Sequence, residues 1–337
     1  MKSLTINIPD MTLLQSINMQ LRNESLTQPV EFEEIKKMEK LDIWFGEISD
    51  LTGLEHAVNL RRIAFRNCKI RDISALKELN SLSSLHFFDC EIGDVSVLSE
   101  LISLKELTIF KCSKVKKIEA LSNISGLEKL DLSYNKITKI NHLKSLNKLE
   151  ELYLEGNKIK DISGLKYLNN LKILSLDNNN VKSISELEGL INLEELKLTD
   201  NKICDIAALN KLVNLKSLFL GDNNIKDIST LKNLNSLRNV NLTKNQISDI
   251  SALGNISKKA DLESLNGHMQ TLHVVNFKPF EIIDFKSEKY YVSPSLDNVR
   301  FSDNSVIFDF NHIHESESDD SINRICCFDG EVHLNII

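Results

Sequence analysis

The sequence contains few residues that interrupt or loosen a chain, with 4 prolines and 11 glycines among 337 residues. This scarcity argues against collagen-like segments and long flexible linkers. No run of about 18 apolar residues occurs, so no membrane-spanning helix is predicted. The net charge of −7 argues against nucleic-acid binding, because phosphate contact needs a basic surface. The 42% of hydrophobic residues is enough for a sizeable core.

The cysteines show neither a CxxC pair nor the spacing of zinc ligands. They are Cys68, Cys90, Cys112, Cys204, Cys326 and Cys327. We expect free, buried thiols, which fit a reducing compartment. The first residues, MKSLTINIPDMTLL, lack the continuous apolar segment of a secretory signal. The sequence therefore favours a cytoplasmic location, and export by a route without an N-terminal signal peptide is the alternative.

Motifs of common enzymes are missing too, since no P-loop, GxSxG, HExxH or dinucleotide fingerprint occurs. We therefore expect a protein that is not an enzyme and that needs no cofactor or metal. His312 and His314 are spaced to share one strand face beside acidic residues, so metal binding there is an alternative to an exposed polar loop. Cys326 and Cys327 lie in an apolar strand, with one side chain inward and one outward, or form a redox switch.

A 22-residue repeat dominates the chain and begins most clearly at Leu149, with LEELYLEGNKIKDISGLKYLNN. The shared frame is LxxLxLxxNxIxDIxxLxxLxx, and ten copies follow one another over residues 38–258, the copy from Leu104 being one residue longer. The LxLxL alternation predicts one short strand per copy. One copy cannot bury its apolar side alone, so stacked copies must share a continuous core behind a parallel sheet.

The ninth position of the repeat carries a residue that we expect to be buried. It is Asn135, Asn157, Asn179, Asn201, Asn223 and Asn245 in the later copies, and Cys68, Cys90 and Cys112 in three early ones. A buried amide there can bond to the backbone where the chain leaves the strand. The Asp of the DIS segment is expected to cap the short turn that follows, as at Asp72, Asp161, Asp205, Asp227 and Asp249.

This frame resembles the leucine-rich repeat, and its Ile/Asp-rich form is similar to that of internalins and of the SDS22 class. The resemblance implies an α/β solenoid with a parallel β-sheet on its concave face. Residues 1–37 are expected to form a helical N-terminal cap, since IPDMTLLQSINMQL has apolar residues at helical spacing. Residues 259–337 read as a β-rich C-terminal module, and their place after the repeats is similar to that of an immunoglobulin-like domain.

The concave face should display a row of large side chains. Positions three, five, seven and eight of each copy point outward, and the seventh positions of the first four copies are Trp44, Arg66, Phe88 and Phe110. Neighbouring positions add His86, Tyr134 and Tyr153. The rings could simply cover the sheet or pack under the cap. We predict instead that they bind a partner, because exposed apolar patches often mark interfaces and Trp, Tyr and Arg often dominate binding energy.

The later outward positions are acidic, at Asp131, Glu151, Glu155, Asp177, Glu195, Asp200 and Asp222. This half is expected to be a solvated face or a docking strip for a basic stretch of the partner. The sequence thus predicts a non-catalytic scaffold that binds another protein on its concave face. The resemblance offers two alternatives, an SDS22-like regulatory subunit of a phosphatase and a secreted internalin-like effector that binds a host protein. An enzyme located in residues 259–337 has only the HxH pair in its support.

Overall fold

We describe the protein from a computed structural model that covers residues 4–247, 249 and 252 together with six later strand segments. Those segments are residues 264–268, 272–274, 299–302, 305–309, 328–329 and 331–335. The chain forms two compact units, Met1–Asn179 and Asn180–Ile337. Each unit is described by itself.

The predicted N-terminal helix is present as α1 (Met11–Leu21), followed by the short α2 (Phe32–Ile35). Asp10 begins α1 as its N-cap, because its carboxylate accepts hydrogen bonds from the amides of Thr12 and Leu13, both at 3.0 Å. The apolar face of the helix buries Leu13 and Ile17. The second carboxylate oxygen of Asp10 accepts from the amide of Ser49 at 3.0 Å, which ties the cap to the first repeat.

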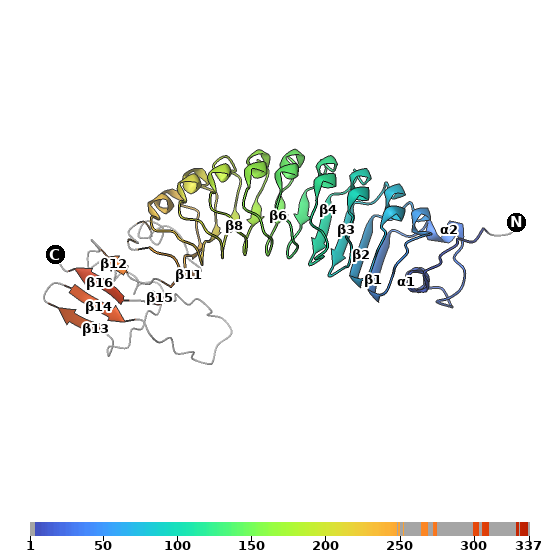
Figure 1. Ribbon diagram of the computed structural model, residues 1–337, viewed down its shortest axis with the longest axis horizontal. Coiled ribbons are helices and arrows are strands. Elements are labelled where there is room, and N and C mark those ends of the chain that lie inside the picture. The colour runs from blue at the N-terminus through green and yellow to red at the C-terminus, as the bar shows by residue number, and fades with distance from the viewer. Residues whose placement is uncertain are drawn as a thin grey trace. The chain divides into compact units, whose positions relative to one another are not determined.

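The strands of the first unit run parallel and follow one another across the sheet in chain order (Figure 1). They are β1 (Lys40–Gly46), β2 (Arg62–Cys68), β3 (Ser84–Phe88), β4 (Glu106–Phe110), β5 (Lys129–Asp131), β6 (Glu151–Tyr153) and β7 (Ile173–Ser175). The strands from β1 to β6 are each followed by a 3-10 helix: η1 (Leu54–His56), η2 (Ser74–Glu78), η3 (Ser96–Glu100), η4 (Glu119–Asn123), η5 (Asn141–Ser145) and η6 (Ser163–Tyr167). These 3-10 helices lie on the opposite side of the unit from the strands.

The second unit repeats this plan. Its parallel strands are β8 (Glu195–Lys197), β9 (Ser217–Phe219), β10 (Asn239–Asn241) and β11 (Ser264–His268), with η7 (Ser185–Leu187), η8 (Ala207–Lys211) and η9 (Ser229–Asn233). β11 pairs with β10, and β15 (Phe328–Asp329) pairs with β11. The parallel sheet therefore continues past residue 258, where the sequence analysis places the last repeat.

A separate four-stranded sheet has the order β12 (Leu272–Val274), β16 (Glu331–Asn335), β14 (Ser305–Asp309) and β13 (Val299–Ser302). β12 is parallel to β16, and the other neighbours are antiparallel. The C-terminal segment is thus β-rich where it is described. Its immunoglobulin-like fold stays a prediction, and the pairs His312/His314 and Cys326/Cys327 lie outside the described residues.

The core follows the leucine frame. In β3, Leu85 and Phe87 are fully buried while His86 and Phe88 are half-buried on the other face, as strand alternation requires. Phe87 stacks on the buried Phe65 of the preceding strand, with ring centroids 5.2 Å apart and ring planes at 9°. The predicted direction of both neighbouring phenylalanines is confirmed.

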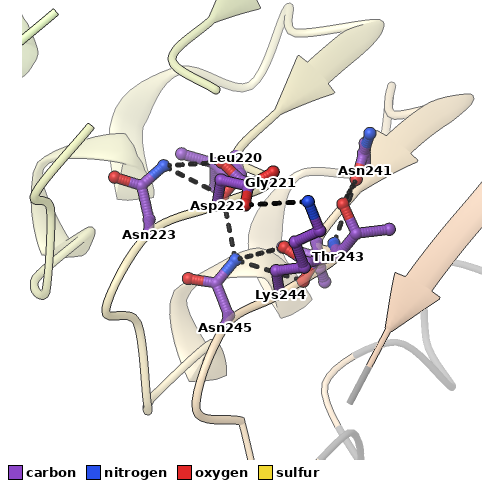
Figure 2. A network of polar contacts seen from close by, with 9 residues as sticks. Leu220, Gly221, Asp222, Asn223, Asn241, Thr243, Lys244 and Asn245 are labelled. Carbon is purple, nitrogen blue, oxygen red and sulfur yellow. Dashed lines mark hydrogen bonds and ion pairs between the residues drawn. The ribbon is translucent and has the colours of Figure 1, made fainter. Parts of the chain in front are cut away.

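The buried asparagines form a hydrogen-bonded ladder, which Figure 2 shows at Asn223 and Asn245. The Nδ2 group of Asn245 donates to the carbonyl of Leu220 in the preceding copy at 2.9 Å and to that of Leu242 in its own copy at 3.1 Å. Its Oδ1 accepts from the amide of Ile225 at 3.0 Å. One side chain thereby satisfies backbone groups of two copies, which explains why a polar residue can be buried at this position.

The cysteine copies satisfy fewer groups. The Cys90 thiol donates to the carbonyls of Phe88 at 3.4 Å and Phe65 at 3.5 Å, and a thiol is a weak donor and acceptor. A hydrogen bond with the Cys112 thiol, together with burial, raises the pKa of Cys90 to about 11, so this thiol is protonated at neutral pH. Cys68, Cys90 and Cys112 are free and buried as expected. Cys204 is free but exposed, so the prediction of burial is wrong there.

The ladder changes chemistry at Asn135, whose Oδ1 is buried and has no hydrogen-bond partner. In the later copies this oxygen accepts from the amide twenty residues earlier, as in the bond from Ile137 to Asn157 at 3.0 Å. The corresponding amide is that of Val115, and it donates to the Cys112 carbonyl at 2.9 Å instead. The extra residue of the copy from Leu104 lies in the turn between Cys112 and Val115, and it redirects the Val115 amide.

Four of the five aspartates of the DIS segments cap the 3-10 turns, as predicted, and the turn after Asp249 lies outside the described residues. Asp161 accepts from the amide of Ser163 at 2.8 Å, and Asp227 accepts from that of Ser229 at 2.7 Å. Asp72 and Asp205 make the same contact at 2.8 Å. The capping residue lies one position before the N-cap, so the interaction is an Asx-type turn that satisfies an otherwise unbonded amide.

Candidate functional site

The candidate site is a row of side chains on the strand face of the first unit, the face that turns away from the 3-10 helices. Strand register places Trp44 opposite Arg66, Arg66 opposite Phe88, and Phe88 opposite Phe110. We call these four residues together with Tyr134 the aromatic column. Parallel strands without a slip bring residues 22 positions apart side by side, which is why the repeat length fixes this alignment.

Arg66 lies between two aromatic rings. Its Cζ atom is 4.8 Å from the ring centroid of Trp44 and 4.1 Å from that of Phe88. Both distances are within the range of cation–π attraction. Trp44 remains 59% exposed, whereas Arg66 and Phe88 are half-buried. The guanidinium is therefore held by apolar neighbours.

The column continues through Phe88, Phe110 and Tyr134. The rings of Phe88 and Phe110 are tilted with centroids 6.5 Å apart, and those of Phe110 and Tyr134 meet edge to face at 5.4 Å. The seventh position of the fifth copy is the small, buried Ser133, so Tyr134 from the eighth position takes the next place. Tyr134 is 47% exposed.

Tyr134 depends on an unusual backbone. Its φ is 57°, in the left-handed region that bulky residues rarely adopt. The same eighth position is left-handed in most copies, at Asn67, Asp89, Lys111, Gly156, Asn178, Asp200, Asp222 and Lys244. A Cβ atom on Gly156 would lie 2.6 Å from the Tyr134 ring, so the glycine leaves room for that ring.

His86 lies beside the column and stacks on Phe88, with centroids 5.8 Å apart. Its Nε2 is 2.7 Å from Ser84 Oγ and its Nδ1 is 3.0 Å from Thr108 Oγ1. Ser84 Oγ also donates to a Glu106 carboxylate oxygen at 3.1 Å. The imidazole is thus fixed at both nitrogens by hydroxyls. The carboxylate contacts the serine and not the histidine, so the arrangement lacks the order of a nucleophile–base–acid triad.

Burial, followed by the positive charge of Arg62 and Arg66, lowers the pKa of His86 below its ordinary value of 6.5. Glu106 and Asp42 partly oppose this shift. We therefore expect His86 to be neutral at pH 7. Since the unfolded chain then binds more protons near pH 6, this residue contributes stability above about pH 6.5 that is lost as the pH falls.

A comparison of wild type with His86→Gln tests this expectation. Urea unfolding at about pH 7.5 and about pH 5 should show that wild type loses more stability on acidification than the variant does. The variant removes the titrating group and leaves the carboxylates of the face in place. Equal losses in both proteins would contradict a lowered pKa at His86.

Tyr153 belongs to another row. It lies opposite Asp131, which lies opposite Thr108, so it shares the fifth position with His86. Its hydroxyl donates to a Glu151 carboxylate oxygen at 3.0 Å, and Glu151 pairs with Lys129 at 2.6 Å. The structure thus places the predicted residues Trp44, Arg66, Phe88, Phe110 and Tyr134 in one column, with His86 beside it and Tyr153 apart.

The predicted acidic strip is partly neutralised. Within the first unit Glu151 pairs with Lys129, and within the second Glu195 pairs with Lys197 and Asp222 with Lys244. Burial raises the pKa of Asp131, although the Ser133 amide donates to it at 2.9 Å. Glu155 accepts from Ser175 Oγ at 2.6 Å. A docking strip for a basic partner stays a prediction.

Sequence reasoning missed Ser84, Thr108 and Gly156. Ser84 and Thr108 occupy outward positions of neighbouring copies, so alignment of the copies places them around His86. The part of the chain that the structure describes contains no cluster of three metal-ligating side chains. No helix among the described residues is long and apolar enough to cross a membrane.

A family model described as leucine rich repeats (2 copies) matches residues 125–167, 169–211 and 213–255. The structure is similar to that of an internalin (inlF) from Listeria monocytogenes, with 29% identity, 81% of this chain and 92% of that chain covered, and a TM-score of 0.69. Internalin C2 from the same organism gives 28% identity, coverage of 72% and 99%, and a TM-score of 0.57.

A leucine-rich repeat protein of Leptospira interrogans shares the fold, with 19% identity, coverage of 84% and 98%, and a TM-score of 0.56. A search of curated proteins gave no significant match. The fold and the repeat define a leucine-rich repeat protein. Within that class, the chain is similar to the internalins of Listeria monocytogenes.

Proposed function

We propose that this chain is a recognition scaffold that binds a protein partner on its strand face through the aromatic column. Leucine-rich repeat proteins are generally non-catalytic scaffolds for protein–protein interaction. The observation that carries the proposal is the alignment of Trp44, Arg66, Phe88 and Phe110 across four adjacent strands. The repeat core does not require these residues, because the leucines behind them are already buried.

The exposure of these rings in the free protein favours binding of a partner. Large rings that stay in water forgo the free energy of burial, about 25 cal/mol per Å² of apolar surface. A partner that covers Trp44, Phe88 and Tyr134 would recover it. These rings are held by their neighbours, so little conformational entropy is lost on binding. Trp, Tyr and Arg are also the residue types most often found at the energetic centre of interfaces.

A crosslinking pull-down tests the proposal. Wild type and Trp44→Ala are compared with the control Tyr167→Ala, which removes a ring that is also exposed but lies at the end of η6 on the opposite side of the unit. We expect a partner that is captured by wild type and by the control but lost or strongly reduced with Trp44→Ala. Equal capture by all three proteins would move the binding site away from the column.

The similarity to inlF over 92% of that protein favours one second candidate, an exported effector that binds a protein of a host cell. The free thiols favour the cytoplasm instead, since Cys204 is exposed and the described cysteines form no disulfide. Pull-downs from an animal-cell lysate and from a lysate of the producing organism separate the two candidates by the source of the Trp44-dependent partner.

A further inference from the structure

Arg66 has an arrangement that differs from those of Arg62 and Lys111 on this part of the strand face. Arg62, on the same strand, lies 3.7 Å from Asp42, and Lys111 lies 2.8 Å from Asp89. Arg66 forms no ion pair among the described residues. Its guanidinium instead contacts the rings of Trp44 and Phe88. Its Nε atom is buried and has no hydrogen-bond partner.

The guanidinium of Arg66 therefore has a hydrogen-bond donor without an acceptor. A guanidinium has five N–H donors in a fixed planar fork, and a buried donor without an acceptor costs free energy comparable to a lost hydrogen bond. The rings on both sides restrict the plane of the fork. Arg66 is therefore preorganised for an acceptor that the described residues of this chain do not supply.

We propose that the partner presents a carboxylate of Asp or Glu, flanked by apolar side chains, and that this carboxylate pairs with Arg66. This inference rests on the proposed function, because it names the chemistry of the partner at the same column. The carboxylate binds the guanidinium fork and the apolar neighbours cover Trp44 and Phe88. The planar fork matches a carboxylate in two parallel hydrogen bonds.

Charge complementarity favours a carboxylate over a phosphate group. The nearby cations Arg62 and Lys111 are already neutralised by Asp42 and Asp89, so a single positive charge is available between the rings. A single carboxylate balances it, whereas a phosphate dianion would leave one negative charge desolvated.

A random-peptide phage library is the probe for this inference. Selection on the full chain is compared with selection on Trp44→Ala, on Arg66→Gln and on Arg61→Gln, the last being an exposed arginine of the same repeat outside the column. We expect wild type and Arg61→Gln to recover peptides in which Asp or Glu lies beside apolar residues. Trp44→Ala should lose these peptides, and Arg66→Gln should lose the acidic residue from the recovered motif.

Binding of a synthetic peptide with the most frequent motif then measures the interaction between Arg66 and the acidic residue of the peptide. Arg66→Gln should weaken its binding by about 10- to 100-fold, and the peptide with its acid replaced by the amide should lose a similar factor on wild type. Combining both changes should cost little more than either alone. Arg66→Lys should also weaken binding, because it keeps the charge and loses the planar fork. Circular dichroism and thermal unfolding confirm that each variant is folded.

The outcomes separate the two claims. Peptides that need Trp44 but show no acidic residue, and that bind Arg66→Gln normally, would overturn the carboxylate and leave the proposed function in place. A selection with no Trp44-dependent peptide would count against the column as a binding site and would overturn this inference with it.

Discussion

Phe87→Ala and Phe88→Ala should have opposite effects although the two residues are adjacent. Phe87 is fully buried against Phe65, so its truncation should lower the free energy of unfolding by about 3–5 kcal/mol. Phe88 is half-buried on the strand face, and its truncation should lower stability by about 1 kcal/mol or less. Urea unfolding followed by circular dichroism measures both values.

The order should reverse for partner binding. Phe88 contacts Arg66, His86 and Phe110, so it is the centre of the aromatic column. Its replacement by alanine should weaken binding to the captured partner by about 2–4 kcal/mol. Phe87→Ala, measured where it remains folded, should bind nearly as wild type does. A Phe88→Ala protein that binds normally, or that unfolds as readily as Phe87→Ala, would refute this division of roles.

Asn157→Ala should destabilise the protein by about 2–4 kcal/mol, more than Asn135→Ala does. Asn157 satisfies groups of two copies, since its Oδ1 accepts from Ile137 and its Nδ2 donates to the carbonyls of Leu132 and Leu154. Alanine would leave the buried amide of Ile137 without an acceptor.

Asn135 is the matched control, because it lies one copy earlier and is equally buried. Its Nδ2 makes the corresponding bonds, at 2.6 Å to Ile109 and 2.8 Å to Leu132, but its Oδ1 has no partner. Alanine removes that unsatisfied oxygen, so the loss should be about 1 kcal/mol. Urea unfolding of the two variants side by side decides the matter. Equal losses would show that the acceptor role of the ladder contributes little.

The repeat frame predicts much of the described fold because each leucine position repeats one physical demand, burial behind a short strand. That demand places Leu85 and Phe87 inside and His86 and Phe88 outside, as observed. It also sets the strand register, and with it the alignment of Trp44, Arg66, Phe88 and Phe110. The prediction failed at Cys204 because residue type was weighed above position. Cys204 occupies a variable position of the frame, between Ile203 and Asp205, and is exposed.

Details of the candidate site depend on side-chain conformations that the frame does not determine. The sequence shows an arginine between two aromatic positions, but it does not show that Nε is buried and unpaired. It shows Ser84 and Thr108, but not that both hydroxyls bond to His86. It shows a copy that is one residue longer, but not that Val115 then turns away from Asn135. Such effects arise from local packing between copies and cannot be read from one copy.

Because the ladder changes from thiols to amides at Asn135, the hydrogen bonding between neighbouring copies differs along the first unit. In the copies before that residue, thiol groups form few and weak hydrogen bonds between neighbouring copies. In the copies after it, asparagine side chains link neighbouring copies through both donor and acceptor atoms. The copies with the weaker links carry Trp44, Arg66, Phe88 and Phe110. A partner bound across β1–β4 would stabilise the copies that are most weakly linked to one another. Its binding should therefore slow amide hydrogen exchange chiefly in these four strands.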